Sequence, residues 1–300
     1  GLLGVSTMAP LAAAAPLRGL RVLDLSRLLP GPYATQLLRD LGATVLKVES
    51  PKGDPLRQYP PLAPDGNSIM FHAVNRGKGS VSLDLHSQKG LSQLRTLLRS
   101  ADVLVESFRP GVLEDMLGYA YDPTTPSSHP IRADYPELVV ARLSGFGQAD
   151  TSPGHDVNYV ASAGLLGMAA EPSLPPVQIA DLAGGALPAV VQILAALLAR
   201  RDTGQGAIID VNLTAGALAT LCLPLSRFLL NGEEVGRGRD PLAGASASYD
   251  VYPAACGGSI VVGALEPHFW HRLCTVVLGP NDEASTVALP RPPPPITPGT

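Results

Sequence analysis

The sequence predicts an α/β fold in which a mostly parallel, Rossmann-like sheet carries helices on both of its faces. Two observations support this prediction. Short strands rich in valine and leucine alternate with segments of helical spacing through residues 20–211, and 31 glycines and 30 prolines punctuate the 300 residues. Strands covered on both faces form nearly continuous apolar runs, and a helix between two strands lets them lie parallel.

The first predicted elements are a strand at residues 20–25, a Pro-Gly-Pro turn at 30–32, and a helix at 33–41 that stops at Gly42. Apolar residues at helical spacing indicate the helix, and glycine is a typical stop. The further predicted elements are strands at 44–48, 80–85, 103–106, 138–143 and 208–211, helices at 91–99 and 181–201, and a surface loop rich in proline and hydroxyl residues at 119–134.

The charge and hydropathy of the chain exclude several classes of function. The 22 lysines and arginines against 26 aspartates and glutamates leave a net charge of −4, which gives no general attraction to nucleic acid or to an anionic membrane. The longest apolar stretch, residues 187–199, is interrupted by Gln192 and is too short to span a bilayer. We therefore expect no nucleic-acid partner and no membrane span.

The cysteines indicate the compartment. They number three and form no Cys-x-x-Cys pair, which argues against a disulfide framework and against a cysteine zinc site. The alanine-rich run at residues 11–17 is a poor targeting signal. The sequence therefore predicts an intracellular protein, and it leaves the mitochondrion, the peroxisome and the cytoplasm open.

A dinucleotide-binding domain is the first alternative for a chain that begins with this strand–turn–helix–strand pattern. In that case Glu49, at the end of the second strand, would be the acid that binds ribose. The loop after the first strand, residues 26–32, reads Ser-Arg-Leu-Leu-Pro-Gly-Pro. It has too few glycines for the backbone to approach a pyrophosphate closely. We therefore expect neither a nicotinamide nor a flavin cofactor.

Eight segments in a fixed order carry a resemblance to a known family. They are residues 20–54, 75–85 (NRGKGSVSLDL), 101–114 (ADVLVESFRPGVLE), 141–148 (ARLSGFGQ), 154–159 (GHDVNY), 179–185 (IADLAGG), 204–213 (GQGAIIDVNL) and 261–270 (VVGALEPHFW). Together they resemble the family III CoA-transferase superfamily, the CaiB/BaiF-like proteins, over residues 17–279. The GHDVNY and GALEPHFW segments resemble the α-methylacyl-CoA racemases of this superfamily rather than its transferases.

The resemblance implies a racemase, or epimerase, of 2-methyl-branched fatty acyl-CoA thioesters. Such an enzyme removes the α-proton, forms an enolate and returns a proton on the opposite face, so it needs two bases around one carbon. The resemblance assigns these roles to His155 and Asp181, and it gives Glu266 the role of orienting His155. It implies an acyl-CoA substrate, with CoA as part of the substrate and no separate cofactor.

Two other functions remain open. Asp181 corresponds to the covalent nucleophile of the transferases, so a family III CoA transferase is one alternative, and an inactive fragment that binds CoA is the other. His155 discriminates between racemase and transferase, because a transferase that works through an aspartyl thioester needs no second base at that position.

The residues around the two bases also have simpler interpretations. His155 follows Gly154 and precedes a predicted helix, whose N-terminus disfavours a positive imidazolium and would keep His155 neutral. Asp156 and Asp181, however, also stand where helix caps are common. The backbone amides of Gly154 and Asp156, or those after Asp181, are the expected donors to the enolate oxygen.

The resemblance places CoA across the large domain, against a strand end and the GHDVNY segment, with three basic residues as further candidates for its phosphates. The residues at the strand end are Leu83, Asp84, Leu85 and His86. Those of the GHDVNY segment are Gly154, Asp156, Val157, Asn158 and Tyr159, and the basic residues are Lys47, Lys78 and Arg109. The simpler interpretation of the three basic residues is solvated surface charge. A possible zinc stripe, His268, His271 and Cys274, drifts around its helix and lacks a fourth ligand, so we expect no metal site.

The chain departs from the superfamily pattern at Ser50, Gly79 and His86, where cations are common. Each lost charge-assisted contact would cost about 1.5–3 kcal/mol of binding free energy. We therefore expect weak CoA binding.

The predicted domains are a disordered segment at 1–16, a large CoA-binding α/β domain at 17–225, a partial small α+β domain at 226–279 and a proline-rich tail at 280–300. Because members of the superfamily continue beyond this point, we expect a C-terminally truncated chain. The resemblance implies a homodimer, which the missing return segment would disturb. We expect low activity and poor solubility, which a complete C-terminus would restore.

Overall fold

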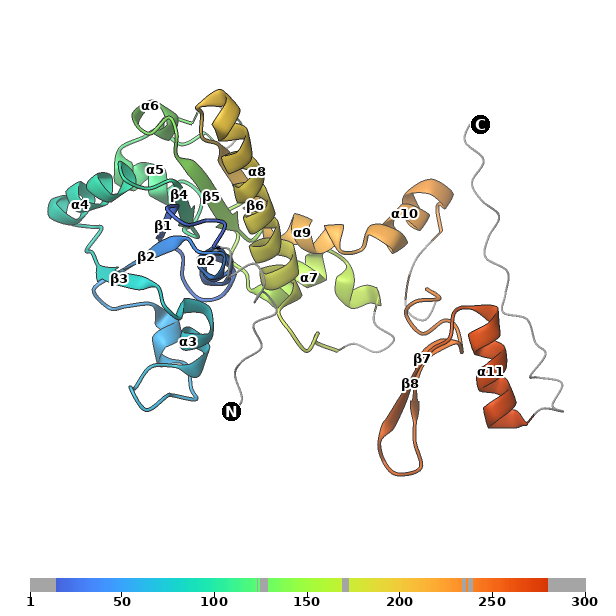
Figure 1. Cartoon of the computed structure of the whole chain (residues 1–300). Helices are drawn as coiled ribbons and strands as arrows, with labels where there is room; N and C mark the ends of the chain where they lie inside the picture. Colours follow the sequence, from blue (N-terminus) through green and yellow to red (C-terminus); the bar gives the residue numbers. More distant parts are fainter. Residues whose placement is uncertain are drawn as a thin grey trace. The chain divides into compact units, whose positions relative to one another are not determined.

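The structure is a computed structural model that describes residues 15–122, 124, 129–168, 173–233, 236 and 240–279 (Figure 1). The predicted tail at 280–300 and nearly all of the predicted segment at 1–16 lie outside these residues. The chain divides into two compact units. The large unit is Gly1–Leu165 with Leu174–Leu221, and the small unit is Leu166–Ser173 with Cys222–Thr300.

The large unit contains a six-stranded parallel sheet with the order β3-β2-β1-β4-β5-β6. Its strands are β1 (Arg21–Asp24), β2 (Thr44–Glu49), β3 (Gly79–Ser82), β4 (Val103–Glu106), β5 (Val139–Ser144) and β6 (Ile208–Asn212). Every residue of the neighbouring interior strands β4 and β5 is buried, as expected for strands covered on both faces. The predicted α/β fold is confirmed.

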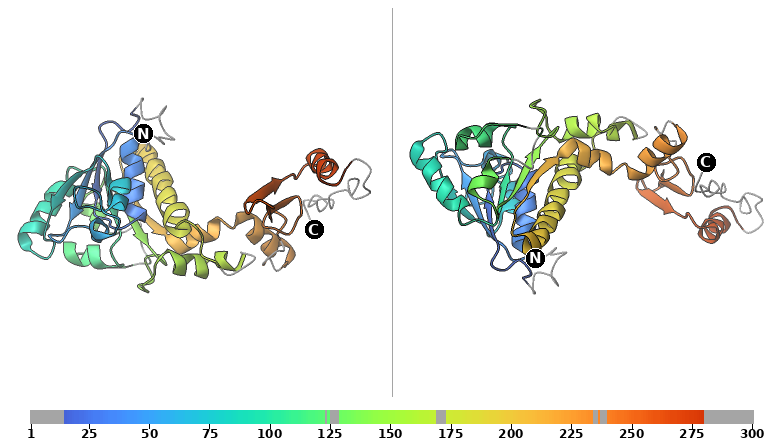
Figure 2. Two further views of the ribbon diagram at one scale, coloured as in Figure 1. Left: turned by 90° about the horizontal axis from the view of Figure 1, so that it is seen from below. Right: turned by 90° about the horizontal axis from the view of Figure 1, so that it is seen from above.

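Helices cover both faces of this sheet (Figures 1 and 2). On one face, Leu94 and Leu113 pack in a single apolar cluster with Leu104 of β4 and Val140 of β5. On the other face, α2 and α8 contact each other and the strands. The α-helices of this unit include α2 (Pro30–Asp40), α3 (Ile69–Asn75), α4 (Gln88–Leu98), α5 (Val112–Leu117), α6 (Ile131–Asp134) and α8 (Leu187–Thr203).

Helix α2 begins at Pro30, three residues before its predicted start. Proline suits the first position of a helix because its missing N–H has no partner there and its φ is already helical. Gly31 lets this first turn approach the end of β1, since a Cβ at Gly31 would lie 2.2 Å from the Cβ of Ser26. The predicted turn at 30–32 is therefore the first turn of the helix.

The predicted helix at 181–201 begins as a π-helical segment, η4 (Ala180–Ala186), and continues as α8. The apolar stretch at residues 187–199 was judged too short to span a bilayer. The combined helix, Ala180–Thr203, is longer, and by length and composition alone it could cross a membrane, so that expectation about the length was wrong. In the large unit, Ala189 and Ile193 are fully buried and α8 contacts β5 and β6. One face of the helix is therefore part of the core of this unit, whereas Val191 and Leu198 on the rest of the helix are exposed.

The predicted surface loop at 119–134 is partly buried. Ile131 belongs to the apolar cluster, and the His129 Nε2 atom lies 2.6 Å from Oε1 of Glu114. Arg142 of β5 pairs with the same Glu114 carboxylate and with Glu106 of β4. Because buried charges are stable only when they are paired, this network fastens the segment to the sheet.

The small unit contains α10 (Cys222–Asn231), an antiparallel hairpin of β7 (Tyr249–Pro253) and β8 (Ser259–Gly263), and α11 (Pro267–Leu278). Glu266 is the N-cap residue of α11, directly before Pro267. The sequence placed the domain boundary after residue 225. The structure starts this unit at Cys222 and adds Leu166–Ser173 to it.

Candidate active site

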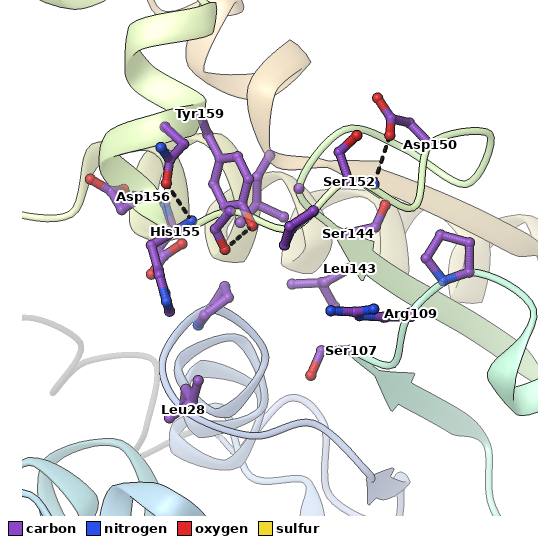
Figure 3. Close-up of a pocket in the computed structure, with 18 of the residues that line it drawn as sticks. Leu28, Ser107, Arg109, Leu143, Ser144, Asp150, Ser152, His155, Asp156 and Tyr159 are labelled. Atoms are coloured by element: carbon purple, nitrogen blue, oxygen red, sulfur yellow. Dashed lines mark hydrogen bonds between the residues drawn. The ribbon is translucent and has the colours of Figure 1, made fainter.

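Two cavities open in the large unit where the parallel strands end. The His155 cavity, about 600 Å³, is lined by residues that follow β1, β4 and β5, by α7 (Asp156–Ser162) and by Asp181 (Figure 3). The His86 cavity, about 890 Å³, is lined by the end of β2, by residues that follow β1, β2 and β3, and by part of the segment that follows β4. Arg27 and Phe108 line both cavities, so the two adjoin. The strand order reverses between β1 and β4, and parallel sheets bind ligands beside such a reversal.

His155 is the N-cap residue of α7, and its side chain is exposed. Its backbone N–H donates to Oδ1 of Asn158 at 3.0 Å, which fixes the entry into the helix. In Figure 3 the imidazole extends away from α7 toward the side of the cavity where Leu28 lies. The predicted helix start at this residue is confirmed, and the imidazole is available to a ligand in the cavity.

Tyr159 holds the loop before α7 in place. Its hydroxyl donates to the carbonyl oxygen of Gly154 at 2.6 Å, and its ring packs edge-on against Phe146. A Cβ at Gly145 or Gly154 would lie 2.2 or 2.6 Å from the Tyr159 ring. Both glycines are therefore needed for this close packing, which positions His155.

Asp181 is the second residue of η4 and is half-buried in the wall of the His155 cavity. Close packing fixes this helix, because a Cβ at Gly184 would lie 2.6 Å from the backbone nitrogen of Ala217 in α9 (Leu213–Ala219). Burial and the nearby Asp156 carboxylate raise the pKa of Asp181 to about 7. A carboxyl with this pKa can both accept and release a proton near neutral pH.

Asp156 connects the two predicted bases. Its Oδ1 accepts the backbone N–H of Asp181 at 3.0 Å, so the GHDVNY segment is joined to the helix that carries Asp181. His155 and Asp181 are 26 residues apart in the sequence and line the same cavity. The structure thus brings the two predicted bases together.

Lys78 is not placed to bind CoA. Its side chain is 1% exposed, and its ammonium donates to Asp24 Oδ2 at 3.0 Å, Pro32 O at 2.8 Å, Thr35 Oγ1 at 2.8 Å and Asn75 Oδ1 at 2.9 Å. Because an ammonium has three protons, these acceptors saturate it. The prediction that Lys78 binds a phosphate of CoA is therefore wrong. The alternative, that Lys78 is a solvated charge on the surface, is wrong as well.

Lys47 lines the His86 cavity, but its charge is already compensated. The side chain is 2% exposed, and its Nζ donates to the Ser26 carbonyl at 2.7 Å and lies 3.0 Å from Oδ2 of Asp54. The prediction that Lys47 is a free phosphate ligand is therefore also wrong. Glu49, the acid considered for ribose binding, is bound by the Arg57 guanidinium at 2.6 and 2.7 Å.

Arg27 and Arg109 supply positive charge to the His155 cavity. The sequence singled out Arg109 and missed Arg27, which directly follows the first strand in the Ser-Arg-Leu-Leu-Pro loop. Position at a strand end was the available signal for Arg27. Sequence reasoning also missed Lys52, which lines the His86 cavity. Each cavity therefore has a cationic side chain other than the buried Lys47 and Lys78.

The remaining predicted ligands divide between the cavities. The strand-end residues 83–86 line the His86 cavity, whereas Gly154, Asp156, Asn158 and Tyr159 line the His155 cavity. Val157 belongs to neither lining and is 39% exposed, so the prediction that it contacts CoA is not supported by either cavity. Glu266 lies in the small unit, so its predicted contact with His155 stays a prediction.

Glu106 supports the wall shared by the two cavities. Its Oε2 accepts the backbone N–H of Phe108 at 2.7 Å, and burial raises the pKa of Glu106 to about 7 despite the neighbouring Arg142. This bond orders the turn after β4, which carries Phe108 and Arg109 into the cavities. Within the described part of the chain, no three side chains of the metal-binding types gather in one place.

The chain matches the family model of CoA-transferase family III over residues 17–291. The parallel sheet, with acid–base residues and cations at its carboxyl edge, is consistent with this match. The chain belongs to CoA-transferase family III.

Relatives of known activity include both racemases and transferases. The chain is 36% identical over 270 residues to the α-methylacyl-CoA racemase of Homo sapiens, a match that covers 86% of this chain and 63% of the racemase. It is 36% identical over 277 residues to the acetyl-CoA:oxalate CoA-transferase of Acetobacter aceti, covering 89% of this chain and 68% of that protein. Sequence identity therefore does not separate the two reactions.

Solved structures agree with this assignment. A CaiB/BaiF family protein from Brucella suis has a TM-score of 0.77 and 30% identity, covering 91% of this chain and 73% of the other. The protein Rv3272 from Mycobacterium tuberculosis has a TM-score of 0.70 and 32% identity, covering 87% of this chain and 67% of the other. The likeness extends over most of the chain and confirms the predicted fold.

Proposed function

We propose that this chain catalyses two-base racemisation of a 2-methyl-branched acyl-CoA thioester. The observation that carries the proposal is the presence of His155 and Asp181 in the lining of one cavity. The pKa of Asp181, raised to about 7 by burial and by Asp156, suits a group that must take up a proton in one direction and release it in the other.

The proposed reaction needs no oxidant and no metal. One base removes the proton from C2 of the thioester, the C–H electron pair forms an enolate with charge on the thioester oxygen, and the conjugate acid of the other base protonates C2 on the opposite face. Asp156 is the first residue of α7, and the first amides of a helix have no partner within the helix. Its N–H is therefore a suitable donor to the enolate oxygen.

We place a CoA ester across the two adjoining cavities, because Arg27 and Phe108 line both. We place the thioester in the His155 cavity and the nucleotide end of CoA in the His86 cavity, where Leu83, Leu85 and Met116 give an apolar wall and Lys52 adds a positive charge. Arg27 lines both cavities and is placed to contact a phosphate between them.

The second candidate function is CoA transfer with Asp181 as a covalent carboxylate. It is favoured by the equal identity of the racemase and the acetyl-CoA:oxalate transferase to this chain. In that reaction the Asp181 carboxylate would attack the acyl-CoA thioester and expel the CoA thiolate, giving a mixed anhydride; the thiolate would then attack the Asp181 carbonyl and release the acyl group as its carboxylate, leaving an aspartyl-CoA thioester. His155 would have no role as a base in these steps. We favour racemisation because the imidazole of His155 lines the same cavity as Asp181.

Incubation of the chain with one pure epimer of a 2-methylacyl-CoA tests the proposal. We expect chiral chromatography to show the second epimer growing until the two are nearly equally abundant, because two bases can serve both directions and the epimers, which differ only in configuration at C2, have nearly equal free energies. Acetyl-CoA with oxalate is the parallel assay for transfer. An unchanged epimer together with oxalyl-CoA formation would replace the proposal with the transferase.

A further inference from the structure

We propose that the side chain of Asp156 is a positioning residue for Asp181: its carboxylate holds the Asp181 backbone in the cavity wall and places a negative charge beside the Asp181 carboxyl. This inference rests on the proposed function, in which Asp181 is one of the two bases. It concerns the side chain of Asp156, whereas the proposed reaction uses only its backbone N–H.

The geometry supports this role directly. Oδ1 of Asp156 accepts the Asp181 N–H at 3.0 Å across 25 residues of sequence, and both residues line the His155 cavity. Asp181 lies in the first turn of a π-helical segment, where backbone N–H groups have no partner within the helix. The Asp156 carboxylate supplies that missing partner, so the start of η4 is fixed to the start of α7.

The charges around Asp181 make Asp156 the main electrostatic neighbour. Burial raises the pKa of Asp181, and the Asp156 carboxylate raises it further. The elements that pack on η4 are α2, α7, α8, α9 and β6. Their charged or titratable residues are His155, Asp156 and Tyr159 on α7; Tyr33, Arg39 and Asp40 on α2; Arg200, Arg201 and Asp202 on α8; and Asp210 on β6, with none on α9. Arg27, Arg109 and Asp150 also line the cavity.

A consequence for protonation follows. Two carboxyl groups close together cannot both ionise without cost, so one of them keeps its proton to higher pH. If Asp156 lost its charge while keeping its oxygen acceptor, the Asp181 carboxyl would remain in place and would ionise more easily. A purely structural role of Asp156 would leave the ionisation of Asp181 unchanged in such a variant.

The variant Asp156→Asn separates these roles, because its amide oxygen still accepts the Asp181 N–H. The pKa of Asp181 is read by ¹³C NMR titration of the chain labelled in its aspartate carboxyls, with the Asp181→Asn spectrum identifying the resonance. We expect the pKa to fall by about one unit in Asp156→Asn. In the direction in which Asp181 removes the proton, the acidic limb of kcat/KM against pH should move by the same amount.

The matched control is Asp150→Asn, which neutralises another carboxylate of the same cavity. Oδ1 of Asp150 caps the Ser152 N–H at 2.7 Å, so its side chain is engaged elsewhere and Asp181 should titrate as in the parent chain. Asp156→Ser is a second uncharged variant for use if the asparagine variant does not fold, as judged by circular dichroism.

An unchanged Asp181 pKa in the folded uncharged variants, or an equal fall in Asp150→Asn, would overturn this proposal. The NMR titration needs no substrate, so it separates this inference from the proposed function. A parent chain that leaves a pure epimer unchanged would count against racemisation, whereas the titration would still decide whether Asp156 controls Asp181.

Discussion

His155→Ala is expected to reduce epimerisation by at least about a hundredfold, while binding of the CoA ester stays largely intact. Alanine cannot accept or return the C2 proton, and positioned acid–base groups contribute roughly 10²–10⁴-fold to rate. The fold should be retained, because the imidazole is exposed and the helix entry is fixed by the bond from the His155 backbone N–H to Asn158. Chiral chromatography measures the rate, and isothermal calorimetry measures binding.

His72→Ala is the matched control, since His72 is also exposed and pairs with Asp65 outside both cavities. Its epimerisation rate should equal that of the parent chain. Full activity in His155→Ala would rule out the two-base mechanism with this histidine.

Asp181→Asn is expected to abolish epimerisation as well, because an amide does not exchange a proton with C2 under these conditions. In the parent chain the direction that uses Asp181 as base needs this carboxyl ionised and His155 protonated, so the acidic limb of its pH profile should follow the ionisation of Asp181 between about pH 6 and pH 8. Burial and the Asp156 carboxylate raise the pKa of this carboxyl to about 7. Rate measurements from each epimer across this range test the expectation.

The same residue distinguishes the two candidate reactions. Intact-mass spectrometry of the parent chain after incubation with acyl-CoA should show no added CoA, because a base forms no covalent bond to the substrate. Asp202→Asn, an exposed aspartate on α8, is the control variant for activity. A CoA thioester on Asp181 would establish the transferase and end the racemase proposal.

Regular elements with strong local patterns could be predicted from the sequence. Val103–Glu106 was predicted to the residue, because a short valine-rich run between a helix and a loop has few alternatives. The helix starts at His155 and Asp181 were also visible, since glycine and aspartate before an apolar run mark helix entry. The fold class followed from the alternation of such elements.

The roles of the basic residues could not be predicted in the same way. A lysine in a sequence carries no sign of whether it will be buried, and the pairing of Lys78 with Asp24 joins residues 54 positions apart. Arg27 has no distinctive motif, yet the end of β1 brings it to both cavities. These outcomes depend on which strands become neighbours, and local spacing does not encode that order.

The measurement that tests the central claim most directly is deuterium uptake at C2 when one epimer of a 2-methylacyl-CoA is incubated with the chain in heavy water. Two bases that exchange protons with solvent predict deuterium at C2 of the opposite epimer, with one mass unit added and no label elsewhere in the acyl chain. Label in the opposite epimer should be lost in His155→Ala and in Asp181→Asn, because each variant keeps only one of the two bases. An ester that binds to the chain but gains no deuterium at C2 would contradict the account.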